Sequence, residues 1–200
     1  MLDACAGHGN KSWVLADDVG QAGTLDATDL STMKLEDLHR AGHRVQQVWA
    51  VDWTAGSDEV PREYDRALVD APCSGTGTLR RRPEIALRRT PEDLARLAAL
   101  LVAIGRGVAG HLRDGRRLVF SVCSVLREEA EDVVAALLAE PASAATDAVA
   151  SPVVRLSPAP FESEPLATLA AGATSLRLLP HVHGTDGYFV ACFEVRRIVN

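Results

Sequence analysis

This 200-residue sequence lacks the features of a membrane or secreted protein. No apolar run approaches the roughly 20 residues that a helix needs to cross a bilayer. The N-terminus does not resemble a signal peptide either, because Asp3, His8 and Lys11 interrupt any apolar stretch there. We therefore expect a cytoplasmic protein.

Metal-binding patterns are also missing. The four cysteines, Cys5, Cys73, Cys123 and Cys192, are far apart, and none forms a C-x-x-C pair. This spacing gives no sign of a zinc site or a redox motif, so we expect free thiols in a reducing compartment. His181 and His183 would point the same way on an extended segment, but no third ligand is evident. We interpret them as part of a turn packed near the site and predict no metal.

A basic overall charge, typical of nucleic-acid binders, is absent as well. The net charge is −6, which argues against an extended Lys/Arg-rich surface. Five arginines nevertheless fall within ten positions: Arg80, Arg81, Arg82, Arg88 and Arg89. Composition alone leaves open whether they form a contact for a polyanion or a solvated turn and helix start.

The composition is that of a folded protein, with 47% hydrophobic and 24% charged residues. A chain of this length suits one domain with a full core. Periodicity and turn signals predict strands near 1–5, 24–29, 45–51, 66–70, 117–121, 153–156 and 187–195, and helices near 11–18, 31–41, 91–112 and 128–138. Thr90 and Pro91 should begin the third helix, and Asp114-Gly115 should end it. The Ala-, Ser- and Pro-rich stretch 141–175 is expected to be mainly a long connection.

Alternating strands and helices predict an α/β fold, a mostly parallel central sheet with helices on both faces. Ligands bind such sheets beyond the carboxyl ends of the strands. Polar or glycine-rich residues stand at five expected strand ends: 5–10, Asp29, Asp52, 70–77 and 121–124. We expect these five segments to converge on one edge.

The first of these ends contains Gly7-His8-Gly9, which allows a tight turn and close approach of a ligand. It is not a phosphate-binding P-loop, because Asn10 occupies the position where that motif has glycine. A dinucleotide-binding fold would have a third glycine where Ser12 stands.

The next two ends carry carboxylates suited to a nucleoside. Asp29 stands where such folds bind ribose hydroxyls, and Asp52 could accept a hydrogen bond from an adenine amino group. Lys11 could neutralise a carboxylate on the ligand. Each residue alone is better explained as surface or capping, but together they favour adenosine binding.

Two further ends carry cysteines, Cys73 behind Asp70-Ala-Pro and Cys123 in Ser-Val-Cys-Ser. Neighbouring strand ends would place both thiols in one pocket. A single loop cysteine is usually an apolar filler, as we interpret Cys5 and Cys192 within their strands. Two on converging loops indicate chemistry.

At these motifs the sequence resembles the Sun/Fmu group of bacterial RNA cytosine-5 methyltransferases. The matching segments cover nearly the whole chain in the family's order: 2–11 (LDACAGHGNK), 70–77 (DAPCSGTG), 79–85 (LRRRPEI), 120–124 (FSVCS) with Glu128 and Glu129, and 180–189 (PHVHGTDGYF). The resemblance implies a Rossmann-like class I methyltransferase fold, with residues 1–200 as one catalytic domain. It also implies S-adenosylmethionine as cofactor and RNA as substrate, ribosomal RNA being favoured over transfer RNA.

By resemblance, Cys123 attacks carbon 6 of cytosine, Cys73 assists release, and Asp70 lies near the base and cofactor. Carbon 5 becomes nucleophilic enough to take a methyl group only after a thiolate adds to the ring. The base must also be unstacked, which favours single-stranded or loop RNA. The implied cofactor-binding residues are Cys5, Ala6, Gly7, His8, Gly9, Asn10, Lys11, Asp29, Asp52 and Asp70.

Three departures from the family pattern stand out. Its first motif usually reads Ala-Ala-Pro-Gly-Gly-Lys, whereas His8 and Asn10 here replace proline and glycine. Val122 stands where members usually have threonine. The family also carries an RNA-recognition region before the first motif, which we expect to be absent here, so that a partner or a further segment would supply RNA affinity.

Other functions remain open. A non-catalytic S-adenosylmethionine-binding relative would explain the altered first loop, but not two retained cysteines. A DNA cytosine-5 methyltransferase would use Pro72-Cys73, yet would have no need for Cys123, and its Glu-Asn-Val motif is not found. A nicotinamide dehydrogenase lacks both the third glycine and an evident acid–base pair.

Overall fold

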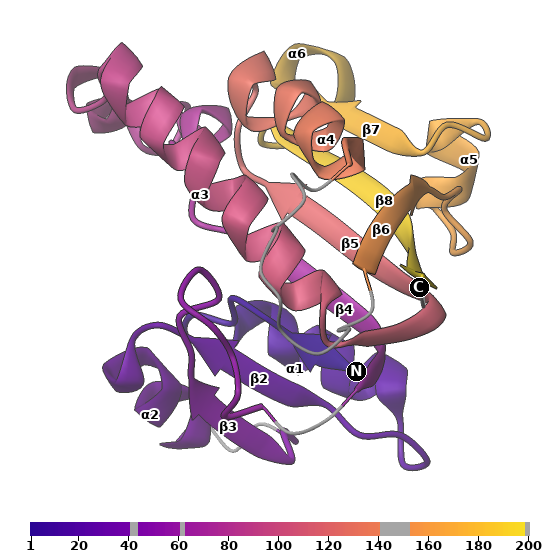
Figure 1. Ribbon diagram of the computed structural model, residues 1–200. Helices are drawn as coiled ribbons and strands as arrows, with labels where there is room; N and C mark the ends of the chain where they lie inside the picture. Colours follow the sequence, from indigo (N-terminus) through magenta and orange to yellow (C-terminus); the bar gives the residue numbers. More distant parts are fainter. Residues whose placement is uncertain (41–43, 61–62, 141–152, 199–200) are drawn as a thin grey trace.

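The computed structural model describes residues 1–40, 44–60, 63–140 and 153–198 (Figure 1). Its strands are β1 (Leu2–Asp3), β2 (Asp26–Asp29), β3 (Gln47–Ala50), β4 (Tyr64–Asp70), β5 (Leu112–Val122), β6 (Val153–Pro158), β7 (Ser175–Leu178) and β8 (Tyr188–Ile198). The α-helices are α1 (Asn10–Val19), α2 (Thr32–Arg40), α3 (Pro91–Ala109), α4 (Glu131–Leu138), α5 (Leu166–Ala170) and α6 (Pro180–His183). Three short 3₁₀ helices complete the set: η1 (Thr76–Thr78), η2 (Pro83–Leu87) and η3 (Arg127–Glu129).

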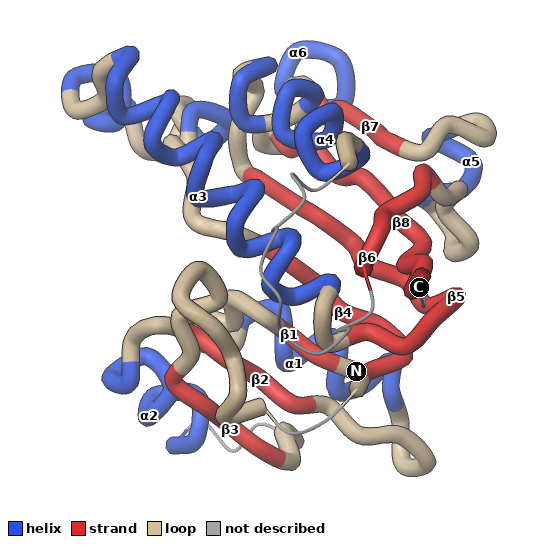
Figure 2. Tube along the Cα trace, viewed as in Figure 1, coloured by secondary structure: helices blue, strands red, loops and turns tan. Residues whose placement is uncertain are grey.

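The strands form one sheet in the order β3-β2-β1-β4-β5-β8-β6, and β7 pairs with β8 beside this path. β1 to β5 pair in parallel, whereas β8 pairs antiparallel with β5, β6 and β7. Within the parallel part, the order in which strands are added reverses between β1 and β4. Doubly wound sheets bind their ligands at this switch point. The expected α/β architecture is thus confirmed (Figure 2).

The contacts made by the two successive side chains of β1 show which helices cover which face of the sheet. Leu2 belongs to the main core together with Leu101 of α3, while the neighbouring Asp3 accepts a hydrogen bond from Ser12 of α1. Asp3 pairs with Ala27 of β2, which packs in a smaller cluster with Leu38 of α2. Because successive side chains of a strand point to opposite faces, α3 lies on one face and α1 and α2 on the other.

The C-terminal boundary predicted for the third helix is wrong. Its start is as expected: Thr90 is the N-cap residue, Pro91 is the first helical residue, and Thr90 and Asp93 form a capping box. The helix ends at Ala109, however, and Leu112 already begins β5. Asp114-Gly115 lies inside that strand, where Gly115 has φ +70° and the pairing with β4 shifts register. This turn signal therefore marks an irregularity in a strand rather than a helix end.

The stretch 141–175 contains more structure than the sequence suggested. Residues 141–152 lie outside the described part, β6 confirms the expected short strand, and α5 and β7 were not predicted. The segment 180–183 forms the short helix α6, so the extended arrangement on which a metal pair at His181 and His183 would depend is not present. None of the helices in the described ranges has the length and apolarity needed to cross a bilayer.

Candidate active site

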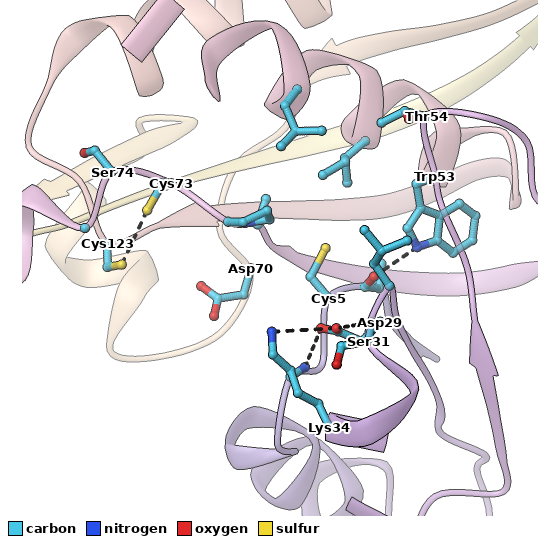
Figure 3. Close-up of a pocket in the computed structure, with 18 of the residues that line it drawn as sticks. Cys5, Asp29, Ser31, Lys34, Trp53, Thr54, Asp70, Cys73, Ser74 and Cys123 are labelled. Atoms are coloured by element: carbon cyan, nitrogen blue, oxygen red, sulfur yellow. Dashed lines mark hydrogen bonds and ion pairs between the residues drawn. The ribbon is translucent and has the colours of Figure 1, made fainter. Parts of the chain in front are cut away.

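The carboxyl ends of β1 to β5 border a cavity of about 700 Å³, within the usual size range of small-molecule sites. Cys5, Asp29, Asp52, Asp70, Cys73 and Cys123 all line it. Figure 3 shows Cys73 and Cys123 at one end and Trp53 and Thr54 at the other, with Asp70 and Cys5 between them. The predicted convergence of five strand ends on one edge is confirmed.

Asp29 organises the glycine loop that follows β1. Its Oδ2 accepts a hydrogen bond from the backbone N–H of Gly7 at 3.0 Å, and its Oδ1 accepts one from Ser31 N–H at 2.9 Å. Lys34 Nζ lies 3.7 Å from the same Oδ1. Gly7 has φ +57°, and no atom lies within 4 Å of the place where a Cβ would stand. The loop therefore leaves open space in a conformation that favours glycine.

Asp52 lies at the far end of the cavity, on the exposed turn that follows β3. Its Oδ1 accepts hydrogen bonds from Thr54 N–H at 2.9 Å and Thr54 Oγ1–H at 2.7 Å, which lower the pKa of Asp52. The adjacent Trp53 is buried, and its indole N–H donates to the Ala4 carbonyl at 2.9 Å. The turn is thereby fixed to the end of β1.

Several residues expected at the cofactor do not line the cavity. The ones absent from its lining are Ala6, His8, Gly9, Asn10 and Lys11. His8 is exposed and its Nδ1 lies 3.1 Å from Asp37 of α2. Gly9 is the N-cap residue that precedes α1, with φ +85°. These residues therefore belong to the loop and the start of α1 without lining the cavity, whereas Cys5 and Gly7 line it.

Lys11 points toward the cysteine end of the site. Its ammonium forms an ion pair with Asp70 and lies 6.0 Å from the centre of the Tyr188 ring. Burial acts to lower the pKa of Lys11, but the hydrogen bond and charge of Asp70 outweigh it, so the pKa is raised. In this structure the lysine is thus the ion-pair partner of Asp70.

The register of β4 and β5 brings the two cysteines together. Asp70 pairs directly with Ser121 in the parallel ladder, so the loops that follow leave the sheet side by side. The Sγ atoms of Cys73 and Cys123 lie 3.4 Å apart (Figure 3). Sequence reasoning predicted this shared pocket, and the structure confirms it.

The two thiols differ in acidity. The hydrogen bond from Cys73 lowers the pKa of Cys123 to about 7, against the opposing effects of burial and of Asp70. The same hydrogen bond and burial raise the pKa of Cys73. Burial also raises the pKa of Cys5 and of Cys192. The directions of these two shifts, both set first by the contact between the thiols, favour Cys123 as the thiolate of the pair.

Three residues at this end, Ser74, Gly77 and Glu129, were given no role by the sequence analysis. Glu129 is fully buried and binds Ser74, the residue after Cys73. Gly77 N–H donates to the Cys123 carbonyl at 3.0 Å, and a Cβ at position 77 would lie 2.0 Å from the Gly187 carbonyl oxygen. The glycine pattern of 70–77 was the available signal for Gly77; nothing in the sequence distinguishes Glu129 from the exposed Glu128.

Comparison with known proteins assigns the family. Residues 1–194 match the family model described as 16S rRNA methyltransferase RsmB/F. The chain belongs to this family. It is 33% identical over 195 residues to a probable ribosomal RNA small subunit methyltransferase B of Bacillus subtilis, covering 95% of this chain and 42% of that protein. It is 39% identical over 140 residues to ribosomal RNA small subunit methyltransferase B of Thermus thermophilus, covering 70% of this chain and 34% of that protein.

Solved structures share the fold of this RsmB/F family member. PH0851 superposes with a TM-score of 0.75 at 25% identity, covering 96% of this chain and 42% of that one. NSun6 from Pyrococcus horikoshii with SFG gives a TM-score of 0.73 at 24% identity, covering 96% and 47%. The chain thus spans less than half the length of these relatives, as it does with the Bacillus protein.

The cavity of this family member suits an adenosine-containing cofactor. Asp29 and Asp52 both line it, and each carboxylate retains acceptor capacity beyond the bonds it already makes. The open space beside Gly7 admits close approach of a ligand to the backbone. His8 and Asn10, which depart from the usual motif, are outside the cavity lining. Neither altered residue therefore forms part of the cavity wall.

The arginine cluster lies close to the cysteine loops. Arg81, Arg82 and Arg89 line the cavity. Arg80 and Arg81 both lie against Asp186, with Arg80 at 3.6 Å. Arg89 Nε donates to the Ser74 carbonyl at 3.2 Å. Part of the cluster's charge is thus used within the protein.

Proposed function

We propose that this chain transfers a methyl group from S-adenosylmethionine to carbon 5 of cytosine in RNA through a covalent Cys123–cytosine intermediate. The observation that carries the proposal is the pair of thiols, 3.4 Å apart, at the adjoining ends of β4 and β5. The cavity beside them has the carboxylates and open backbone that an adenosine cofactor requires. Membership of the RsmB/F family favours RNA over DNA and ribosomal RNA over transfer RNA.

The residues divide the chemistry between them. The Cys123 thiolate adds to carbon 6 of the base, and the electron pair of the carbon 5–carbon 6 double bond becomes available at carbon 5. Bound S-adenosylmethionine supplies the methyl group that carbon 5 takes. Asp70 stands between the thiols and Cys5 (Figure 3), so its carboxylate is placed to orient the base beside the cofactor.

Release requires two further bond changes. A base must remove the proton from carbon 5, and the bond between Cys123 and carbon 6 must break with its electrons returning to sulfur. Cys73 is the neighbouring thiol. Once Cys123 is bonded to the base, Cys73 no longer faces a thiolate, which frees it to assist this step.

The substrate is proposed to be an unpaired or flipped-out cytosine, because stacking would bar Cys123 from the face of the ring. Arg81, Arg82 and Arg89 line the same cavity and could hold the flanking phosphates. The net charge of −6 offers little further attraction for RNA. We therefore propose that RNA affinity depends on a partner or on a further segment.

The test is incubation of the chain with labelled S-adenosylmethionine and small-subunit ribosomal RNA, followed by nucleoside analysis. Label in 5-methylcytosine is expected, with none in the Cys123→Ala variant. Cys192→Ala is the matched control, since Cys192 lies in β8 outside the cavity, and it should remain active. Label in another nucleoside would refute the proposal, as would equal labelling by Cys123→Ala.

A further inference from the structure

Ser74, which follows Cys73 directly, is held through all of its polar groups. Its N–H donates to Glu129 Oε1 at 2.7 Å, and its hydroxyl donates to Glu129 Oε2 at 2.5 Å. Its carbonyl accepts the hydrogen bond from Arg89 Nε. Ser74 is 1% exposed. The backbone beside Cys73 is therefore fixed from two sides by charged residues.

The two cysteine loops are also joined to each other. Ser124, which follows Cys123, has its Oγ 3.4 Å from Ser74 Oγ and 3.0 Å from Thr76 Oγ1. Val125 N–H donates to Thr76 Oγ1 at 3.3 Å, and Gly77 N–H donates to the Cys123 carbonyl. A network of buried hydrogen bonds thus joins the chain after one thiol to the chain after the other.

Glu129 is the charged centre of this network. It lies at the end of η3 and is 0% exposed. No ion pair joins it to a cation in the part of the chain that the structure describes. A buried carboxylate without a cation costs several kcal/mol unless its hydrogen bonds compensate. Here the compensation comes from the Ser74 N–H and hydroxyl, and an apolar side chain in place of Glu129 would leave these two buried donors without that acceptor. The carboxylate is thus matched to Ser74.

We propose that Glu129 is a positioning residue whose carboxylate, acting through Ser74, holds the Cys73 thiol against Cys123 as a hydrogen-bond donor. This rests on the proposed function, in which the donor prepares Cys123 for attack. The negative charge of Glu129 also contributes to the raised pKa of Cys73, after the larger effects of Cys123 and burial. This charge acts in the same direction as the positioning, since it favours the proton on Cys73.

The first test needs no RNA. Wild type, Glu129→Gln and Glu128→Gln are treated with limiting iodoacetamide at neutral pH, and alkylation of Cys123 and Cys73 is measured by mass spectrometry. Glu128 is the matched control, because it precedes Glu129 in η3 and is exposed. We expect the preference for Cys123 over Cys73 to fall about tenfold in Glu129→Gln, equivalent to about one pKa unit, and to stay unchanged in Glu128→Gln.

Activity and stability distinguish positioning from a merely structural role. We expect single-turnover methyl transfer by Glu129→Gln to fall by about tenfold or more, with the KM for S-adenosylmethionine unchanged. Ser74→Ala, which removes the hydroxyl donor but keeps the N–H donor, should also lower methyl transfer. The loss in the double variant should be smaller than the sum of the single losses, because both substitutions act on the contact between the same two residues. Ser74→Ala also carries the test if Glu129→Gln does not fold.

Unchanged alkylation preference, with activity that simply follows the folded fraction in thermal melts, would overturn the proposal. So would additive losses in the double variant. Failure of the proposed function has a different signature: wild type would methylate no RNA, while the alkylation preference would still change in Glu129→Gln.

Discussion

Lys11 and Asp70 form an ion pair across 59 positions of sequence, joining the first turn of α1 to the end of β4. The pair lies where the cofactor half of the site meets the cysteine half. Both groups act on Cys123: the charge of Asp70 raises its pKa, and the charge of Lys11 lowers it. The lysine therefore offsets the carboxylate that stands beside the nucleophile.

The Lys11→Gln variant should have a less acidic Cys123. Removing the ammonium takes away one attraction for the thiolate and leaves Asp70 without its cation, and both changes raise the pKa. The midpoint of Cys123 alkylation against pH should move upward from about 7. Lys34→Gln, which removes a cation beside Asp29, is the control and should leave it in place. An unchanged midpoint in Lys11→Gln would contradict the assignment.

The sequence predicted the site's convergence but not its finer contacts. Parallel strands carry their carboxyl ends to one edge, so Asp29, Asp70 and the cysteine loops follow from element order alone. The direction of Lys11 depends on where α1 begins and on the packing of Asp70 against it. Glu128 and Glu129 are chemically identical neighbours, yet one is exposed and the other fully buried. Only tertiary packing decides such a difference.

The same dependence on tertiary packing explains the errors in the predicted secondary structure. Leu112 continues the apolar periodicity of α3, but it is fully buried as the first residue of β5. β7 has four residues and is stabilised by pairing with β8. A strand of four residues carries too little alternation to stand out from the sequence, and its formation depends on the partner strand rather than on local propensity.

Asp3 predicts a measurable pH dependence of stability. Burial raises its pKa to about 6, although the Ser12 hydroxyl donates to it at 2.7 Å. Between pH 4 and 6 the folded state holds a proton that the unfolded state has released, so stability falls as pH rises through this window. The loss attributable to this group is roughly 3 kcal/mol, about two pKa units.

The Asp3→Asn variant should lose this contribution while keeping an acceptor for Ser12. Denaturant unfolding at pH 4 and pH 7 measures it: the free-energy difference between variant and wild type should shift in favour of the variant at pH 7. Asp58→Asn, on an exposed turn, controls for a general change in net charge. A difference independent of pH would show that Asp3 does not titrate in this range.

RNA affinity should be weak, strongly salt-dependent and sensitive to the arginine cluster. Changing Arg80, Arg81 and Arg82 together to Gln should reduce the slope of log affinity against log salt by about 1 in magnitude. Three cations that each released a counterion from a single strand would account for a change of roughly 2. The reduction reflects Asp186, which already neutralises part of the charge. The control is a double variant of Arg113 and Arg116. These two arginines form ion pairs with Asp65 near the amino ends of β4 and β5, outside the lining of the cavity. An unchanged slope in the triple variant would place the RNA contact elsewhere.

The roles of the two cysteines can be separated on one denaturing gel with labelled RNA and cofactor. Cys123→Ala should give neither methylation nor a covalent complex, because no thiolate reaches carbon 6. Cys73→Ala should still attack and methylate but release poorly, so a methylated RNA–protein species should accumulate and survive denaturation.

An enzyme that used Pro72-Cys73 as the nucleophile loop would give the reverse result, and a non-catalytic protein would give no adduct with either variant. Since the thiols are only 3.4 Å apart, reach alone does not decide between them. Accumulation of the adduct by Cys123→Ala instead of Cys73→Ala would exchange the two roles, despite the lower pKa of Cys123.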